Sequence, residues 1–314
     1  MKDMPWLQPS IDRLNRLLQG GRLPHAMLLN ARLGNGAELL GMEMAASLLC
    51  ESPQMGYACS HCKGCQLFKA GSHPDFVRLD PEGAARSIRI DAVREMVQRF
   101  ATTPQISQRK VALMVRADTL NHNAANALLK TLEEPPGNSV LLLQNEGQRP
   151  LLPTVRSRCQ PLPVNPPTRE QVMEWLKAQG FELSGEETWL HMLRHEPLRI
   201  AAFLRENQMD DWQRFQAVMQ GVGSGQLNPV VAVKSLEKSA IELDDQLNWI
   251  EAAIHHSNSE RAIAGGVLSQ RLPELQHQLQ QIRRELTPGI STNRVLLQEH
   301  LFTLWHQFHR LQAN

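Results

Sequence analysis

This sequence has no excess of charge of either sign. Its 314 residues include 33 Lys and Arg against 32 Asp and Glu, so the formal net charge is +1 at pH 7. Proteins that attract nucleic acid through their overall field carry a clear positive excess. The composition therefore excludes strong long-range attraction to nucleic acid, and any contact with DNA must be local.

Long apolar segments are absent as well. No run of about 18 apolar residues occurs, so no membrane-spanning helix is predicted. The first residues, Met1–Trp6, lack the apolar core of a signal peptide. There is also no internal repeat or low-complexity segment. We therefore expect the chain to remain in the cytoplasm, where thiols stay reduced.

Core-forming segments alternate in the middle of the chain. Val111–Val115 is a short apolar run typical of a buried strand, and Val140–Leu143 is another. Between them, Ala124–Leu132 carries apolar residues at helical spacing, and Asn121 suits the N-cap of this helix. Glu133–Gly137, with its two prolines, ends the helix. A strand, a helix and a strand in close succession indicate a parallel α/β sheet.

Further elements are predicted closer to the N-terminus. Ile11–Leu18 has the periodicity of an amphipathic helix, whereas His25–Leu29 and Phe76–Leu79 are typical of strands. Asp91 suits the N-cap of a helix that follows the second of these strands. These elements extend the predicted α/β domain over the first half of the chain.

The second half of the chain has helical periodicity. A proline-rich segment at 161–167 marks the end of the first domain, and 314 residues exceed one ordinary core. The apolar stripes are Val172, Trp175, Leu176; Trp189, Leu190, Leu193; Trp212, Phe215, Val218, Met219; Leu243, Leu247, Ile250, Ile254; Leu268, Leu272, Leu275, Leu279, Ile282, Leu286; and Leu301, Leu304, Trp305, Phe308. We expect these stripes to form helical cores.

Four of the five cysteines lie close together, as Cys50-x8-Cys59-x2-Cys62-x2-Cys65. Reduced thiols grouped in this way usually bind metal, because thiolates are soft ligands and four of them close a tetrahedron around zinc. The spacing differs from the common ferredoxin patterns, so structural zinc is favoured over an iron–sulfur cluster, with unliganded thiols as the third alternative. His61 could replace one ligand, and Gly56 and Gly64 would permit the tight turns of such a module.

Two motifs connect the chain to a known family. Residues 126–136 read Asn-Ala-Leu-Leu-Lys-Thr-Leu-Glu-Glu-Pro-Pro, and residues 157–159 read Ser-Arg-Cys. In order and separation these motifs resemble those of bacterial clamp-loader subunits of the AAA+ class, and the resemblance covers the whole chain. It implies an α/β AAA+ domain at 1–163 with a zinc module inserted at 50–65, a small helical lid domain at 164–206 and an all-α collar domain at 207–314.

The resemblance places a nucleotide-binding loop at Ala31–Glu38. An active loop begins with glycine and later carries a lysine followed by Ser or Thr, because amides and the lysine hold the phosphates and the hydroxyl ligates magnesium. Here Ala31, Ala37 and Glu38 occupy these three positions. Glu38 would also place a negative charge beside the phosphates. The loop is therefore interpreted as a strand–helix turn without a competent ATP site.

The acidic positions of the family support this interpretation. Active AAA+ enzymes carry Asp-Glu after the strand, for magnesium and for the attacking water, whereas this chain has Val115 and Arg116, with Asp118 two residues further on. Asn145 and Arg199 fall at the two sensor positions of active relatives, either as relics or as structural residues. We expect no bound ATP and no ATP hydrolysis by the chain itself.

Arg158, in the Ser-Arg-Cys motif, is the residue to which the resemblance gives a catalytic role. In a ring of AAA+ domains, this loop faces the ATP held by the adjacent subunit, where a guanidinium stabilises charge on the transferring phosphoryl group. Arginine suits this role better than lysine because its planar fork presents several donors. The alternatives are that Arg158 forms a structural ion pair or that Arg156 is the arginine that acts.

Together with the altered loop, the resemblance implies a non-ATPase subunit of the clamp loader of a bacterial replicative DNA polymerase. It would act as a stator and offer Arg158 in trans. The resemblance implies as partners the ATPase subunits and the clamp-opening subunit of a hetero-oligomeric ring, with the sliding clamp and primer–template DNA reached through the assembly. Asn293–Leu297 resembles the start of the collar helix. Arg94 and Arg99 lie on a helix that faces the DNA backbone in clamp loaders, but arginines on a helix surface are more often simply solvated, and the sequence favours that alternative.

Two other functions are also compatible with the sequence. An AAA+ ATPase with its own turnover would show magnesium-dependent ATP binding as a purified monomer. A zinc-knuckle protein that binds nucleic acid without ring partners would bind DNA tightly as an isolated chain. The balanced charge argues against the second of these alternatives.

Overall fold

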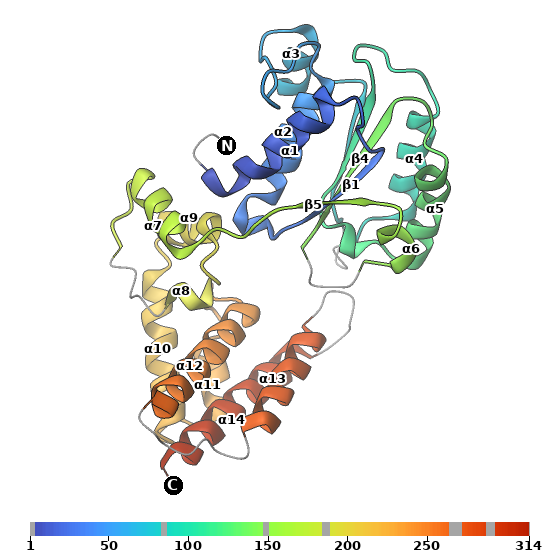
Figure 1. Cartoon of the computed structure of the whole chain (residues 1–314). Coiled ribbons are helices and arrows are strands. Elements are labelled where there is room, and N and C mark those ends of the chain that lie inside the picture. Colours follow the sequence, from blue (N-terminus) through green and yellow to red (C-terminus); the bar gives the residue numbers. More distant parts are fainter. Residues whose placement is uncertain are drawn as a thin grey trace. The chain divides into compact units, whose positions relative to one another are not determined.

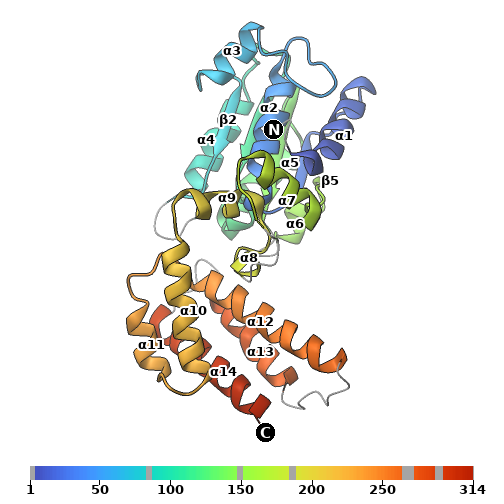
Figure 2. The same cartoon turned by 90° about the vertical axis from the view of Figure 1, so that its left-hand side faces the viewer.

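The computed structural model describes residues 4–82, 87–146, 151–183, 189–263, 272–286 and 293–313. The chain divides into two compact units, Met1–Gln171 and Val172–Asn314. In the described residues, the first unit combines a sheet with helices and the second contains helices only (Figures 1 and 2). None of the described helices is long and apolar enough to cross a membrane. The finer predicted limits of three domains stay a prediction.

A parallel five-stranded sheet forms the centre of the first unit, with the strand order β2-β3-β4-β1-β5. The strands are β1 (Ala26–Asn30), β2 (Phe76–Leu79), β3 (Lys110–Met114), β4 (Ser139–Asn145) and β5 (Gln160–Pro163). Two helices lie on each face of the sheet, α1 (Gln8–Gln19) and α2 (Ala37–Leu49) on one face, and α4 (Ile90–Phe100) and α5 (His122–Glu133) on the other (Figure 1). Because both faces are covered, the central strands are apolar on both sides.

The predicted helices and strands of this unit are present, but one helix begins at a different residue from the one predicted. Asn121 is the N-cap of α5, and its side chain accepts a hydrogen bond from the Ala124 amide at 2.8 Å. Asp91 is not an N-cap, because α4 begins at Ile90 and Arg89 occupies the capping position. Asp91 lies instead in the first turn, where a negative charge also suits the helix dipole.

The second unit is built from the predicted helical stripes. Its helices follow α7 (Arg169–Ala178), which begins in the first unit: α8 (Trp189–Met192), α9 (Pro197–Arg205), α10 (Met209–Gly223), α11 (Pro229–Ser235), α12 (Leu243–Ile263), α13 (Leu272–Glu285) and α14 (Arg294–Ala313). Trp249 lies at the centre of an aromatic core, with ring centroids 5.9, 5.4 and 5.2 Å from those of Trp212, Phe215 and Trp305. The stripes are buried as predicted, except that Leu286 is half-buried; Leu268 and the side chain of Leu272 lie outside the described residues.

A buried aspartate connects β2 to the loop before β3. Asp75 is 1% exposed, and its carboxylate accepts hydrogen bonds from the backbone amides of Gln105, Ile106 and Ser107 at 2.7, 2.8 and 2.9 Å. Burial by itself raises the pKa of this carboxyl, but the three amides and nearby His73 bring the pKa below its ordinary value. The ionised form of Asp75 therefore stabilises the fold.

Replacement of Asp75 by asparagine should destabilise the first unit. The amide side chain can no longer accept three hydrogen bonds as an anion, and hydrogen bonds to a charged group contribute about 1.5–3 kcal/mol each, so we expect a loss of about 3 kcal/mol. A folded-state pKa that is depressed means that this contribution is complete above about pH 4 and is lost as the pH falls through the folded-state pKa. Urea unfolding at several pH values tests this, with the exposed Asp91→Asn as control. Equal stability of the unaltered protein and the Asp75→Asn variant at pH 7 would contradict it.

Candidate functional site

The loop between β1 and α2 is the position predicted for a degenerate nucleotide-binding loop. Within it, η2 (Leu33–Asn35) forms a short 3-10 turn, and Ala37, at the lysine position, begins α2 and is buried. The buried Trp6 donates from its indole Nε1 to the Asn35 carbonyl oxygen at 2.8 Å. The N-terminal segment therefore packs against this loop, and Ala37 provides no cation for a phosphate.

Glu38 occupies the position at which a phosphate-binding loop carries a hydroxyl group. Its Oε1 lies 2.8 Å from Nη2 of Arg78 on β2, and the Nε of Arg78 lies 2.7 Å from Oδ2 of Asp80. Hydrogen bonds to Asp80 and, to a smaller extent, to Glu38 raise the pKa of Arg78 above its ordinary value. The carboxylate of Glu38 is thus part of a surface ion-pair group, and its charge would repel the phosphates of ATP.

Val115 and Arg116 follow β3, at the two positions where the resemblance predicts Asp-Glu in an active AAA+ site. Val115 is buried, and the Nε of Arg116 lies 3.1 Å from Oε2 of Glu146. The Arg116 amide donates to Oε1 of Gln144 at 2.7 Å, and Oδ1 of the buried Asp118 accepts from the Glu146 amide at 3.3 Å. These contacts join the segment after β3 to the end of β4, and neither Val115 nor Arg116 supplies a carboxylate for magnesium.

Asn145, which the sequence places at the first sensor position as a prediction, lies at the carboxyl end of β4. Its Nδ2 donates to Oδ1 of Asn30 at 2.9 Å, and the two residues are aligned in register on β4 and β1. The neighbouring Gln144 is fully buried and donates from Nε2 to the Ala31 carbonyl oxygen at 2.7 Å. The amide side chains at these strand ends therefore tie β4 to the start of the loop after β1.

The four cysteines predicted as metal ligands come together in space. Their sulfur atoms all lie within 4.8 Å of one another, with 4.0 Å between Cys50 and Cys62 and 3.9 Å between Cys59 and Cys65. Four sulfurs at about 2.3 Å from a tetrahedral zinc ion lie about 3.8 Å from one another. The group could therefore hold a metal ion, and its size and donor atoms are compatible with zinc.

Backbone amides surround these sulfur atoms. The amides of Cys59, Cys62 and Cys65 donate to the sulfurs of Cys50, Cys59 and Cys62 at 3.3, 3.4 and 3.4 Å. Backbone hydrogen bonds from His61 and Cys62 lower the pKa of Cys59 to about 6, whereas burial raises the pKa of Cys50 and Cys65. A bound cation would favour loss of the remaining thiol protons. The Nδ1 of His61 lies 2.8 Å from the Cys59 carbonyl oxygen, so this ring bonds within its own loop.

Two glycines allow the 50–65 segment to pack closely on neighbouring parts of the first unit. Gly56 has φ +83°, and a Cβ there would lie 2.8 Å from the Ile11 carbonyl oxygen, so both the turn and the contact require glycine. Gly64 does not form a turn, because it lies within α3 (Lys63–Lys69), where a Cβ would lie 2.9 Å from the Leu49 carbonyl oxygen. The predicted role of Gly56 is confirmed, whereas Gly64 instead permits close approach of α3 to the end of α2.

Arg158 lies between α6 (Pro153–Arg156) and β5, and its guanidinium faces the end of α5. Its Nη2 is 2.6 Å from Oε1 of Glu133, Nε donates to the same oxygen at 3.0 Å, and Nη1 donates to the Thr154 carbonyl oxygen at 2.9 Å. The Arg158 side chain is 35% exposed and the Glu133 side chain 50%. The ion pair of the alternative interpretation is thus present, but it lies at the surface, where an incoming anion can reach the guanidinium.

The two arginines of α4 differ in their surroundings. Nη2 of Arg99 donates to the carbonyl oxygens of Pro74 and Phe76 at 3.1 and 3.2 Å, so this guanidinium holds the entry to β2. The side chain of Arg94 is 62% exposed and lies 3.5 Å from Asp91 on the same helix. Of the two, Arg94 is therefore the more accessible to a phosphate backbone.

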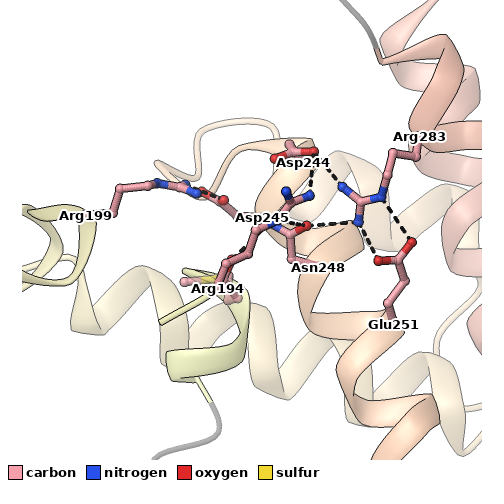
Figure 3. Close-up of polar contacts among 8 residues, drawn as sticks. Arg194, Arg199, Asp244, Asp245, Asn248, Glu251 and Arg283 are labelled. Carbon is pink, nitrogen blue, oxygen red and sulfur yellow. Dashed lines mark hydrogen bonds and ion pairs between the residues drawn. The ribbon is translucent and has the colours of Figure 1, made fainter. Parts of the chain in front are cut away.

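Arg199, predicted to fall at the second sensor position, forms its contacts inside the helical unit. From α9 its Nη2 forms an ion pair with Oδ1 of Asp245 on α12 (Figure 3). Burial raises the pKa of the Asp245 carboxyl, and the guanidinium opposes this by stabilising the anion. Arg199 thus has a structural partner in the second unit.

Asn248 is the centre of a second group of polar contacts on α12. Its Oδ1 accepts from Nε of Arg194 at 2.8 Å and from Nη2 of Arg283 at 2.9 Å, and its Nδ2 donates to the Met192 carbonyl oxygen at 3.1 Å (Figure 3). Asn248 is 5% exposed, and Arg194 has a left-handed backbone with φ +53°. A left-handed conformation is costly for a residue with a side chain, so these contacts help to hold the turn after α8.

Replacement of Asn248 by leucine should destabilise the second unit. Leucine has a similar size, but it leaves two guanidinium donors and a carbonyl oxygen without this partner, and we expect a loss of about 2–4 kcal/mol. Thermal unfolding measures the effect. Arg214→Ala is the control, because the Arg214 side chain is 56% exposed and its ion pair with Asp211 within α10 should contribute less than about 1 kcal/mol. Similar losses in the two variants would contradict a central role for Asn248.

The chain is similar to known proteins in sequence and in fold. A family model described as "DNA polymerase III, delta subunit" matches residues 7–168. DNA polymerase III subunit delta' of Escherichia coli K12 is 32% identical over 95% of this chain and 93% of its own length, and the protein of that name from Pseudomonas aeruginosa is 45% identical over 55% of this chain and 52% of its own length. A crystal structure of a DNA polymerase III gamma subunit-related protein from Thermotoga maritima matches with a TM-score of 0.50 and 15% identity, covering 96% of this chain and all of that one. This likeness supports the predicted fold class.

Proposed function

Because this chain belongs to the family of DNA polymerase III delta' subunits, we propose that it is a clamp-loader subunit that does not hydrolyse ATP itself. In this proposal, Arg158 acts in trans on ATP held by an adjacent subunit of a hetero-oligomeric ring. The assembly would use ATP to open the sliding clamp and to release it on primer–template DNA. The chain would work in the cytoplasm, as part of the DNA polymerase holoenzyme.

The observation that carries the proposal is the presentation of Arg158. The guanidinium lies at the surface, in a loop that leads directly into β5, and it is oriented by contacts to Glu133 and Thr154. An arginine remains charged at any physiological pH, so its ion pair with Glu133 does not remove its ability to bind phosphate oxygens. A cation fixed where negative charge develops accelerates phosphoryl transfer.

The loop after β1 supports the non-ATPase half of the proposal. Ala37 cannot bind a phosphate through its side chain, and Glu38 presents a carboxylate that is already paired with Arg78. Val115 is apolar and Arg116 is cationic, so the positions that ligate magnesium and activate water in relatives lack the required chemistry. Four substitutions with the same consequence support a subunit that does not hydrolyse ATP itself.

We assign the ring-forming surface to the collar helix α14 on the basis of its exposed start. Val295 and Leu296 are 53% and 60% exposed, although apolar side chains of this size are usually buried. Asn293 accepts hydrogen bonds from both of their amides, which fixes the first turn of the helix. Their burial against other clamp-loader subunits would make the chain a stator, while residues 164–206 and 207–314 would act as lid and collar domains.

We also assign a structural zinc ion to the four cysteines. A set of four thiolates leaves no open coordination position for a substrate or a water molecule, so the ion would stabilise the 50–65 segment and would take no part in hydrolysis.

The experiment that tests this function is reconstitution of the ring with Arg158→Ala in this subunit. Ring assembly and ATP hydrolysis are measured separately, by size-exclusion chromatography and by phosphate release. Intact assembly with slower hydrolysis is the expected result. Unchanged hydrolysis by an intact ring would overturn the trans role, and turnover by the isolated chain would overturn the non-ATPase assignment.

A further inference from the structure

Glu133 is the last residue of α5 and holds the Arg158 guanidinium from one side. A single carboxylate oxygen, Oε1, accepts from both Nε and Nη2, at 3.0 and 2.6 Å. From the other side, Nη1 donates to the Thr154 carbonyl oxygen at 2.9 Å and lies 3.4 Å from the Ser157 hydroxyl. Three protein groups, two from the α6 segment and one from α5, therefore determine where this flexible side chain points.

The contacts with Glu133, Thr154 and Ser157 do not use every N–H donor of the Arg158 guanidinium. A guanidinium has five N–H donors, of which Nη2 carries two, and the contact of Nη2 with Glu133 uses one of them. The second Nη2 hydrogen is oriented by the same contact, because the guanidinium is planar. Glu133 therefore binds one Nη2 hydrogen of Arg158 and also fixes the direction of the other.

The ion pair between Arg158 and Glu133 is too exposed, and therefore too weak, to prevent Arg158 from binding a nucleotide. The two side chains are 35% and 50% exposed, and pairs of this kind contribute little to stability. A nucleotide with its magnesium ion offers several charged oxygens in a site from which water is excluded, where an arginine binds more strongly. The main effect of Glu133 is thus on orientation.

We propose that Glu133 is a positioning residue for Arg158 and aligns its guanidinium with the phosphate oxygens of the ATP held by the adjacent subunit. This inference rests on the proposed trans role of Arg158. It gives a catalytic consequence to a carboxylate that touches neither ATP nor water, and that acts only through the arginine. The neighbouring Glu134 caps the helix with its backbone and has no described contact with Arg158, so the two glutamates provide a matched pair.

The test uses the complete reconstituted ring with Glu133→Ala in this subunit. Loss of the orienting carboxylate should lower the single-turnover rate of ATP hydrolysis about threefold to tenfold, since misplacement of a catalytic group by a fraction of an ångström has costs of this order. The KM for ATP should change much less than the rate, because a donor aligned with the charge that develops on the phosphoryl group acts mainly on the transition state. Glu133→Gln should restore part of the rate, since an amide oxygen still accepts from Nε and Nη2. Glu134→Ala should behave as the unaltered ring.

A double variant distinguishes this inference from the function on which it rests. If Glu133 acts through Arg158, adding Glu133→Ala to Arg158→Ala should cause no further loss. A full effect of Arg158→Ala with none of Glu133→Ala would overturn the positioning role alone, and so would a faster rate in Glu133→Ala. No effect of Arg158→Ala in an intact ring would overturn the trans role itself. An equal loss in Glu133→Ala and Glu134→Ala would reveal a general effect on the end of α5 and would also overturn the inference.

Discussion

Substitution of Arg158 by alanine is expected to slow ATP hydrolysis about 100-fold at the site that receives this arginine, while the ring still assembles. Loss of one positioned donor to a developing negative charge costs about 10²–10³ in rate in other enzymes. The fold should tolerate the change, because the side chain is 35% exposed and its ion pair with Glu133 is worth about 1 kcal/mol or less. Single-turnover phosphate release from the reconstituted ring measures the effect.

Two matched variants identify the arginine that acts. Arg156→Ala removes a guanidinium two residues away on α6 and should leave the rate nearly unchanged. Arg158→Lys keeps the charge but loses the planar fork of donors, so it should restore only a small part of the rate. A ring in which Arg156→Ala is the slow variant would assign the trans role to Arg156, against the present proposal.

Loss of the metal is expected to unfold the 50–65 segment. Residues 51–55 are exposed, so the segment buries little apolar surface of its own, whereas structural zinc binds with apparent free energies of about 10–16 kcal/mol in small zinc-binding peptides. The purified chain should therefore contain about one zinc per molecule. Cys62→Ser should reduce this to a small fraction and make the segment sensitive to protease, with the sheet of the first unit intact.

The fifth cysteine provides the control for the metal site. Cys159 is buried, burial raises its pKa to about 11, and it lies outside the group of four sulfurs. Cys159→Ser should keep about one metal ion per chain even if it lowers stability. Zinc content unchanged in Cys62→Ser would contradict the ligand assignment, and iron in the purified chain would favour the iron–sulfur alternative.

Local sequence signals were sufficient for most of the fold. The apolar runs that become β3 and β4 and the helical spacing of α5 each involve neighbours in sequence, and Asn121 caps α5 as predicted. The four cysteines also carry their own information, because metal-binding thiols must meet in space. Asp91 shows the limit of such signals, since an acidic residue suits both an N-cap and the first helical turn, and here it occupies the turn.

Contacts between distant segments could not be predicted in this way. From its place on an amphipathic helix, Arg99 is expected to be a solvated surface arginine. Its guanidinium instead donates to two backbone carbonyl oxygens at the entry to β2. Arg199 and Asp245 are far apart in the chain, and their ion pair depends on how α9 and α12 pack. The contact of Arg158 with Glu133 joins two separately recognised motifs, whose proximity only the folded chain shows.

The central claim is that ATP turnover in the assembly depends on Arg158 of this chain and not on this chain's own loop after β1. The most direct test is the rate of ATP hydrolysis by rings that carry either Arg158→Ala or Glu38→Ala in this subunit, with ring assembly confirmed for both. We predict a large decrease with Arg158→Ala and no change with Glu38→Ala. An unchanged rate with Arg158→Ala together with an altered rate with Glu38→Ala would contradict the claim.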